Sequence, residues 1–200
     1  MQASTLVYLI RHGETPLNAS RVLQHPDTPL SENGLAQARA LASRLASNGL
    51  PSVGRIVSSD YARARSTAEA IAHATGIAIE EEPLLRERNF GDWRGRRYDE
   101  IDFDPIARGL DPPGGENEAV FEERTTRAWE RVSVLASSEP AALVVVTHGL
   151  VCQAIIGRLR APASEPVHIA NTGLTVLESG RGGGWDFERI GCTRHLEEGR

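Results

Sequence analysis

The chain has 200 residues, 40% of them hydrophobic, which is enough to bury one core, so we expect a single domain over residues 1–200. Its formal net charge of -5 argues against nucleic acid or an anionic membrane as a partner, because both require a positively charged surface. There is no apolar run long enough to span a bilayer and no leader pattern, so we expect a cytoplasmic location and no membrane contact.

The first predicted element is a strand, and a helix with clear boundaries follows it. Residues 5–10, "TLVYLI", form a short apolar run that is typical of a buried strand. Ser31 is a suitable N-cap, and Asn48-Gly49 followed by Pro51 is typical of a helix end. The apolar face predicted for this helix consists of Leu35, Ala38, Leu41, Ala42 and Leu45.

A second strand and helix repeat this order, and a long irregular stretch follows them. The strand is "RIVSS" at 55–59, and the helix should begin after the capping residue Asp60 and end at Gly76. Residues 86–116 fit neither the helix nor the strand period and contain several glycines and prolines. We predict that this excursion contains one short helix and lines an active site.

The last part of the chain adds two helices and three strands. The patterns predict a helix over 117–137, a strand at 142–147, a helix after Gly149, and strands near 173–178 and 185–190. Strands that alternate with helices through right-handed crossovers form layers. We therefore predict an α/β fold, a three-layer α/β/α sandwich whose mostly parallel sheet has an antiparallel strand near the C-terminus.

Polar groups follow three of the predicted strands. In chain order they are Arg11, His12, Gly13, Asp60, Arg63, His148 and Gly149. Ligands of open α/β sheets bind beyond the carboxyl ends of the parallel strands, so we expect these groups to converge. Each histidine alone could be a structural residue, but two histidine-glycine pairs at strand ends favour a functional site.

Two histidines beside two arginines favour a phosphoryl group as the substrate. One neutral imidazole can act as a nucleophile while a second, charged one stabilises the developing negative charge. The guanidinium groups of Arg11 and Arg63 can bind phosphate oxygens through paired hydrogen bonds. Glu87, in "LLRERNFGDW" at 84–93, is a candidate acid for the leaving oxygen, or else a surface carboxylate paired with Arg86 or Arg88.

Other kinds of chemistry lack their sequence patterns. Two arginines at the site would repel a divalent cation, and HExxH, CxxC and clustered carboxylates are absent from the sequence. The Walker loop and the GxGxxG dinucleotide pattern are missing as well. Cys152 and Cys192 do not suggest a disulfide framework. We therefore predict neither a metal nor a cofactor.

Six segments, in order, resemble the RHG-containing branch of the histidine phosphatase superfamily, which is also called phosphoglycerate mutase-like. They are "LIRHGETPLN", "LQHPDTPLSENGLAQA", "VSSDYARARSTA", "LRERNFGDWRG", "PPGGENEAVFEER" and "VVVTHGL". The segment "IANTGLTVLE" at 169–178 resembles the part that follows the second histidine in small bacterial phosphatases. The resemblance implies the phosphoglycerate mutase-like fold and a small phosphorylated metabolite as the substrate.

The resemblance also implies a role for each matching residue. His12 would be the nucleophile that becomes phosphohistidine, and Glu87 would be the general acid and base, with no metal in the cycle. The catalytic set would be His12, Glu87, His148, Arg11 and Arg63. The substrate-binding set would be Arg11, Asn18, Gln24, Arg63, His148 and Gly149.

Three functions remain open within this resemblance. Only about thirty residues separate Gly91 from Phe121, too few for the insertion of the similar mutases, and this favours a metal-independent phosphatase. The alternatives are phosphoglycerate mutase activity and a non-catalytic module that senses a phosphorylated ligand. The natural substrate and the oligomeric state also remain open, a homodimer included.

Two residues depart from the family pattern. His25 stands where relatives usually have glycine, and Arg94 stands where they have glutamate. Arg94 belongs to a basic cluster formed by Arg88, Arg94, Arg96 and Arg97. This cluster either recruits a substrate with a second negative group or is balanced by Asp99, Glu100, Asp102 and Asp104.

Overall fold

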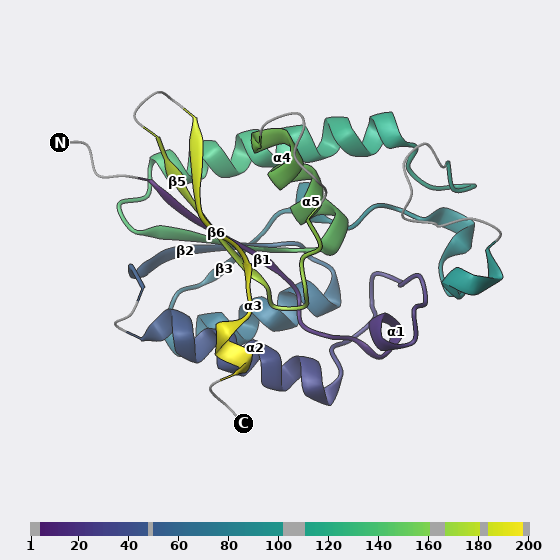
Figure 1. Cartoon of the computed structure of the whole chain (residues 1–200), viewed down its shortest axis with the longest axis horizontal. Helices are drawn as coiled ribbons and strands as arrows, with labels where there is room; N and C mark the ends of the chain where they lie inside the picture. The colour runs from purple at the N-terminus through teal and green to yellow at the C-terminus, as the bar shows by residue number, and fades with distance from the viewer. Residues whose placement is uncertain (1–4, 48–49, 102–110, 161–166, 181–183, 198–200) are drawn as a thin grey trace.

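Six strands form one mixed sheet in the computed structural model, which describes residues 5–47, 50–101, 111–160, 167–180 and 184–197. The strands are β1 (Leu6–Arg11), β2 (Val53–Ser58), β3 (Ile79–Glu81), β4 (Ala142–Thr147), β5 (Leu174–Ser179) and β6 (Trp185–Cys192). Their spatial order is β3-β2-β4-β1-β5-β6 (Figure 1). The first four strands pair in parallel, and β5 runs antiparallel to both of its neighbours. The predicted mostly parallel sheet is confirmed.

Four long helices cover the two faces of this sheet (Figure 1). One face packs against α2 (Glu32–Ala46) and α3 (Ala62–Thr75), and the other packs against α4 (Glu118–Ser137) and α5 (Gly149–Leu159). The alternation of side chains along β1 supplies both cores, because Tyr8 and Ile10 face α2 and α3 while Val7 and Leu9 face α4 and α5. The predicted three layers are therefore present.

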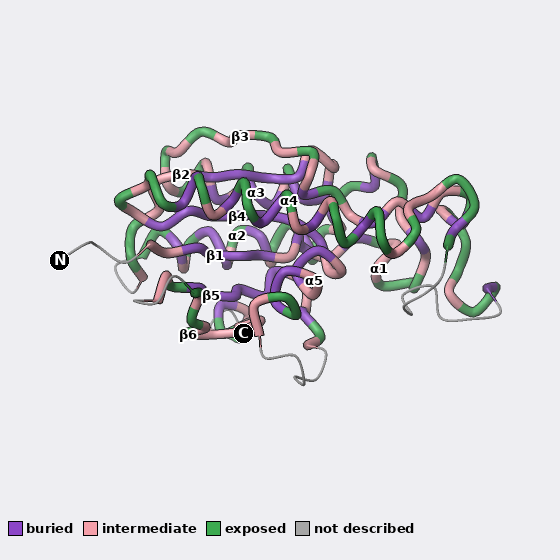
Figure 2. The backbone as a smooth tube through the Cα atoms, turned by 90° about the horizontal axis from the view of Figure 1, so that it is seen from above, coloured by how far each residue is buried: buried purple, intermediate pink, exposed green. Residues whose placement is uncertain are grey.

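Burial follows the order of the strands. All six residues of β4 are buried, as expected for a continuous apolar run in the middle of a sheet covered on both faces. Figure 2 shows β1 and β4 in the buried centre, and the edge strand β3 half-buried to exposed. The short elements are α1 (Pro16–Ala19) and the 3₁₀ turns η1 (Pro83–Leu85), η2 (Gly91–Trp93), η3 (Tyr98–Glu100) and η4 (Arg194–Leu196).

The apolar face predicted for the first helix is wrong at its start. Leu35 is 41% exposed, and the buried residue of the first turn of α2 is Gly34 instead. The reason is close contact between backbones, since a Cβ on Gly34 would lie 2.0 Å from the carbonyl oxygen of Glu14. Ser31 caps the helix as predicted, by accepting a hydrogen bond from the Gly34 amide at 3.0 Å. The predicted helix end at Asn48-Gly49 lies outside the described residues.

Two further local predictions need correction. Asp60 does not cap α3, because its carboxylate pairs with Arg86 and Tyr61 occupies the cap position without a side-chain hydrogen bond. The described part of the excursion has the two 3₁₀ turns η2 and η3 in place of one short helix. The end of α3 is as predicted, with Gly76 in the left-handed conformation at φ +75°.

Candidate active site

The register of two central strands brings the two histidines together. β1 and β4 are parallel neighbours, and Arg11 at the end of β1 lies opposite Thr147 at the end of β4. The next residue of each strand is a histidine, so His12 and His148 emerge at the same edge of the sheet. Their ring centroids are 5.1 Å apart at an interplanar angle of 60°.

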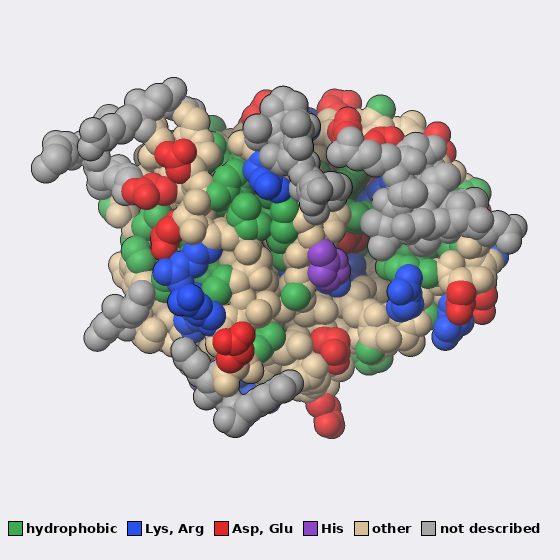
Figure 3. All heavy atoms as spheres, viewed as in Figure 1, with side chains coloured by type: hydrophobic (Ala, Val, Ile, Leu, Met, Phe, Trp, Pro, Cys, Tyr) green, Lys and Arg blue, Asp and Glu red, His purple; other side chains and the backbone are tan. Residues whose placement is uncertain are grey.

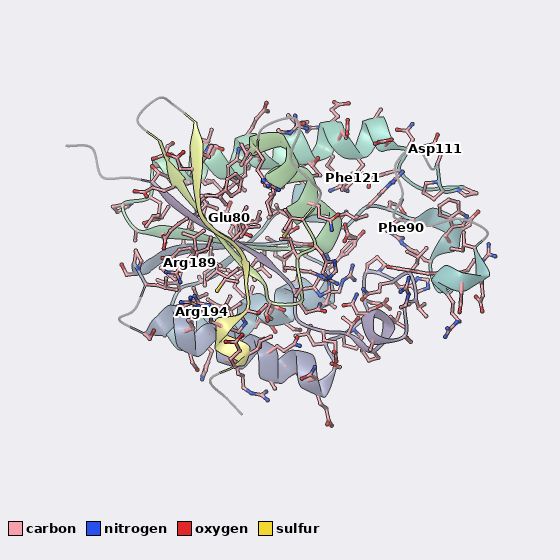
Figure 4. The ribbon with its side chains drawn as sticks, viewed as in Figure 1. Glu80, Phe90, Asp111, Phe121, Arg189 and Arg194 are labelled. Carbon is pink, nitrogen blue, oxygen red and sulfur yellow. The ribbon has the colours of Figure 1, made fainter. Side chains whose placement is uncertain are left out.

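A cavity of about 440 Å³ lies at this edge. The predicted site residues in its wall are Arg11, His12, Asn18, Gln24, Arg63, Glu87 and Gly149. His148 is fully buried and contacts the ring of His12 without lining the cavity. Phe90, labelled in Figure 4, lines the cavity as well, so part of the excursion borders the site as predicted.

Hydrogen bonds to both ring nitrogens define the tautomer of His12. Nδ1 lies 2.7 Å from the carbonyl oxygen of Gly13, which can only accept, so Nδ1 carries the proton. Nε2 accepts a hydrogen bond from Nε of Arg63 at 3.2 Å, so Nε2 carries its lone pair. Burial and the charges of Arg63 and Arg11 lower the pKa of His12 well below its ordinary value. His12 is therefore a neutral imidazole whose Nε2 lone pair faces the cationic side of the site.

His148 differs from the sequence prediction in its charge. Burial, followed by the charge of Arg63 and the neighbouring His12, lowers the pKa of His148 well below its ordinary value. Its Nε2 lies 2.9 Å from the hydroxyl of Ser59, and among the described residues Nδ1 has no hydrogen-bond partner. The sequence suggested a second, positively charged histidine, whereas the burial of His148, and then the nearby charge of Arg63, favour its neutral form.

The two arginines of the site are a buried cation, Arg63, and a half-buried one, Arg11. Arg63 is 1% exposed, donates from Nη1 to the carbonyl of His25 at 3.0 Å, and has its pKa lowered by burial to about 10. Arg11 donates from Nη1 to the carbonyl of Ile169 at 2.7 Å, while its buried Nε lacks a partner among the described residues. Buried charge is costly unless it is paired. Donors that converge in this way form a site suited to an oxyanion.

Glu87 is held by backbone amides, which contradicts the alternative of a surface ion pair. Its carboxylate accepts from the Arg88 amide at 3.0 Å and from the Leu150 amide, at the start of α5, at 3.3 Å. Arg86 pairs with Asp60 instead, and Nε of Arg88 donates to the carbonyl of Glu116. Burial raises the pKa of Glu87 despite these hydrogen bonds. A carboxyl group with a raised pKa can carry a proton for a leaving group.

Asn171 is a site residue that the sequence did not reveal. It lines the cavity, and its Nδ2 donates to the carbonyl of His12 at 3.1 Å and to Oδ1 of Asn18 at 3.2 Å. Gln24, which also lines the cavity, accepts a hydrogen bond from the hydroxyl of Thr15 at 2.8 Å. The available signal was the polar Asn-Thr-Gly sequence directly before a strand.

The two glycines that follow the histidines differ in how closely they pack against neighbouring protein atoms. A Cβ on Gly13 would lie 2.7 Å from the carbonyl oxygen of Gly34, so Gly13 allows α2 to pack against the end of β1. A Cβ on Gly149 would lie 3.5 Å from Nε of Arg11, which is an ordinary van der Waals separation.

None of the four arginines of the basic cluster lines the cavity. Arg97 pairs with Asp99, Arg96 donates to the carbonyl of Glu100, and Arg88 is buried. Asp102 and Asp104 lie outside the described residues. The sequence prediction of charge balance thus holds for Arg97, whereas Arg21, a cation that the sequence did not single out, does line the cavity.

His25 and Arg94 depart from the family pattern without entering the cavity. His25 contributes its backbone carbonyl, which binds Arg63, while its exposed ring lies close to Gly95. Arg94 reaches the hydroxyl of Tyr61 at 3.4 Å.

The described residues contain no group of three or more His, Cys, Asp or Glu side chains that could hold a metal ion. Within the same ranges, every helix is too short or too polar to cross a membrane.

Comparisons with known proteins identify the family of the chain. The family model of the histidine phosphatase superfamily, branch 1, matches residues 7–193. The chain is 34% identical over 204 residues to phosphoglycerate mutase-like protein 4 of Arabidopsis thaliana, covering 96% of this chain and 87% of the relative. It is 32% identical over 209 residues to the probable phosphoglycerate mutase GpmB of Serratia proteamaculans, covering 96% and 94%.

A solved structure gives the same result for the fold. The mycobacterial glucosyl-3-phosphoglycerate phosphatase in complex with VO3 superposes with a TM-score of 0.77 at 27% identity. The match covers 92% of this chain and 98% of the mycobacterial one.

Proposed function

Because the chain belongs to branch 1 of the histidine phosphatase superfamily, we propose that it hydrolyses a small phosphate monoester through a phosphohistidine on His12. One observation carries this proposal: the hydrogen bond from Nε of Arg63 to Nε2 of His12 at 3.2 Å. It aims a neutral, nucleophilic nitrogen at the place where a buried cation would bind a phosphate oxygen.

In the first step, Arg63 transfers its hydrogen bond from His12 to a phosphate oxygen, so the freed lone pair of Nε2 attacks phosphorus while the bond from phosphorus to the leaving oxygen breaks. Glu87 gives its proton to that oxygen, a role that its raised pKa supports. The guanidinium groups of Arg11 and Arg63 bind the non-bridging oxygens and balance their charge. Nδ1 of His12 keeps its proton, and the carbonyl of Gly13 stabilises the positive charge that the ring gains.

In the second step, water attacks the phosphohistidine and the bond from phosphorus to Nε2 breaks. Glu87, now a carboxylate, takes the proton of the water and returns to its starting state. Asn18, Gln24 and Gly149 border the phosphoryl group from the cavity wall, and His148 packs behind the ring of His12. Inorganic phosphate leaves, and every residue is back in its first protonation state.

Phosphoglycerate mutase activity is the second candidate, and the names of the two sequence relatives favour it. Hydrolysis is favoured by the short interval between η2 and α4 and by the activity named for the mycobacterial relative. Incubation with 3-phosphoglycerate separates the two, because a phosphatase releases inorganic phosphate whereas a mutase produces 2-phosphoglycerate. The non-catalytic sensing module has less support, since it would be expected to lack a reactive residue and both His12 and Glu87 are present.

Turnover of p-nitrophenyl phosphate in excess chelator tests the proposal. We expect the wild-type protein to release phosphate at an undiminished rate, and His12→Ala to lose at least about a thousandfold in kcat while remaining folded. His73→Ala, an exchange near the end of α3, is the matched control and should keep full activity. A wild-type protein without turnover, or an active His12→Ala variant, contradicts the mechanism.

We extend the proposal to the setting of the enzyme. A small phosphorylated metabolite is the substrate, the reaction takes place in the cytoplasm, and neither nucleic acid nor a membrane takes part. Cell fractionation followed by assay of each fraction tests the location. A homodimer is compatible with this activity, and sedimentation of the purified protein measures the oligomeric state.

A further inference from the structure

One loop surrounds the two residues at the end of β1. It comprises residues 169–173, between α5 and β5, and binds Arg11 and His12 through both backbone and side chains. The amide of Thr172 lies 3.1 Å from the carbonyl of Arg11 and 3.2 Å from that of His12, and the carbonyl of Gly173 accepts from the Arg11 amide at 3.4 Å. The Asn171 side chain binds the His12 carbonyl and the Ile169 carbonyl binds the Arg11 guanidinium. The loop therefore contributes, together with β4, to the position of Arg11 and His12.

Thr172 holds this loop in a conformation that its own side chain disfavours. Its φ is +54°, in the left-handed region that a β-branched residue rarely adopts. Such a conformation costs free energy and persists only where the surroundings enforce it. Thr172 is fully buried, so packing and hydrogen bonds around its side chain provide that enforcement.

The side chain that binds Thr172 belongs to the C-terminal turn. Nε2 of His195 lies 2.9 Å from the hydroxyl of Thr172 across a sequence distance of 23 residues, and His195 is 4% exposed. His195 lies in η4, which packs against α2 (Figure 1), and its neighbour Arg194 is labelled in Figure 4. The C-terminal turn and the active-site loop are thus joined by one buried hydrogen bond.

The direction of this hydrogen bond follows from the next one. The hydroxyl of Thr172 also lies 2.8 Å from the carbonyl of Asn171, which can only accept. A hydroxyl has a single proton, so both contacts are hydrogen bonds at once only if Nε2 of His195 is the donor. Burial, followed by the charge of Arg44, lowers the pKa of His195 to about 4, so the ring is neutral at the pH of an assay.

We propose that His195 is a positioning residue for the reaction: by donating to Thr172 it holds the 169–173 loop, and through that loop Arg11 and His12, in their catalytic arrangement. The proposal rests on the proposed phosphatase function for its kinetic readout. An imidazole that merely fills space would contribute to stability alone. The two readings differ in what they predict for kcat.

Replacement of the His195 imidazole by a ring that cannot donate a hydrogen bond distinguishes the positioning role from a space-filling role. We expect His195→Phe to lower kcat for p-nitrophenyl phosphate roughly tenfold with a smaller change in KM, since misplacement of the nucleophile slows the chemical step. His195→Gln places an amide donor near the position of Nε2 and should recover most of the loss. Thr172→Val, which removes the hydroxyl but keeps the branched shape, should lose as much as His195→Phe, and the double variant should lose no more than either single variant.

Leu135→Ala is the matched control, because it removes core packing at the far end of α4 and should lower the melting temperature without changing kcat. Amide hydrogen exchange of Thr172 is a readout independent of activity, and we expect it to be at least about tenfold faster in His195→Phe. A wild-type protein without turnover refutes the proposed function, while exchange still tests the positioning role. Thr172→Val or His195→Phe with full kcat and unchanged exchange overturns the positioning role. If His195→Phe does not fold, Thr172→Val decides alone.

Discussion

At the scale of single residues, the protonation states of His12 and Glu87 would define the reactive form in the proposed mechanism. The proposed first step needs His12 neutral and Glu87 protonated. The pKa of His12 is lowered by burial and by Arg63, and the pKa of Glu87 is raised by burial. At the unperturbed pKa values, about 6.5 for histidine and about 4.3 for glutamate, no pH leaves most of the histidine neutral and most of the glutamate protonated. The two opposite shifts therefore widen the pH range in which both groups are in the required state.

The pH dependence of kcat/KM for an alkyl phosphate ester should therefore be bell-shaped. The acid limb marks the protonation of His12 and should lie clearly below about pH 6.5, and the alkaline limb marks the loss of the Glu87 proton. Glu87→Gln cannot titrate, so its slower reaction should lack the alkaline limb. Glu82→Gln keeps the cap of η1 and serves as the control with an unchanged profile. An alkaline limb that survives in Glu87→Gln would assign it to another group.

At the scale of elements, contact between two backbones places α2 against the end of β1. Gly34 in the first turn of α2 lies directly against Glu14, and Gly13 lies against Gly34. In both contacts the opposing atoms belong to backbone, so a side chain cannot be accommodated by a change of rotamer. The position of the segment that follows His12 thus depends on two glycines from separate elements.

Gly34→Ala should therefore lower both stability and activity. A Cβ at 2.0 Å from the carbonyl oxygen of Glu14 forces α2 away from the loop, and overpacking of this kind costs about 1–3 kcal/mol. Gly157→Ala in α5 is the matched control, since a Cβ there meets no atom within 4 Å and should stabilise the helix by up to about 1 kcal/mol. Urea unfolding of both variants measures the difference. Equal stabilities would show that α2 can shift at no cost.

The elements that the sequence predicted are those whose pattern is local. Strands such as "ALVVVT" and helices with caps and terminating glycines can be recognised from about a dozen consecutive residues. The strand β3 has three residues and α1 has one turn, so neither has a period to detect. Leu35 was misassigned because the close packing of Gly34 against Glu14 joins segments twenty residues apart (34 minus 14) and leaves no trace in the periodicity.

The residues of the candidate site that follow strand ends could be predicted from the sequence. Arg11, His12, Arg63 and Gly149 follow from the rule that parallel strands present their carboxyl ends at one edge. Asn171 and His195 could not be found in this way, because Asn171 bonds the backbone carbonyl of His12 and His195 bonds the side-chain hydroxyl of Thr172, both across long sequence separations. The neutral state of His148 likewise depends on burial beside Arg63, which is a property of the folded chain.

At the scale of the whole molecule, the antiparallel strand β5 connects the C-terminus to the site. It pairs with β1, so the loop before it meets the end of β1, and β6 then leads to η4. The face seen in Figure 3 shows basic and acidic side chains interspersed without a broad area of one sign. The cavity wall instead contains three arginines, Arg11, Arg21 and Arg63, beside Glu14 and Glu87, and in the proposed function these arginines would attract the anionic substrate.

The stability of the fold should fall in mild acid. Three buried histidines, His12, His148 and His195, have pKa values below the unfolded value of about 6.5, so below that pH the unfolded chain binds more protons than the folded one. The raised pKa of Glu87 has the opposite effect on stability, but it is one group against three histidines. Urea unfolding at about pH 7.5 and about pH 5 measures the change, and His195→Phe should lose less than the wild type. Equal stability at the two values would mean that these rings can be protonated without cost.

The most direct test of the account is a search for the phosphorylated intermediate. The enzyme is mixed with p-nitrophenyl phosphate, quenched in alkali within one turnover, digested and analysed by mass spectrometry. We predict one added phosphoryl group on the peptide that contains His12, its loss on further incubation in water, and its absence from His12→Ala. Phosphate release by the wild type with His12 unmodified at every time point, or with the phosphoryl group on another residue, would contradict the account.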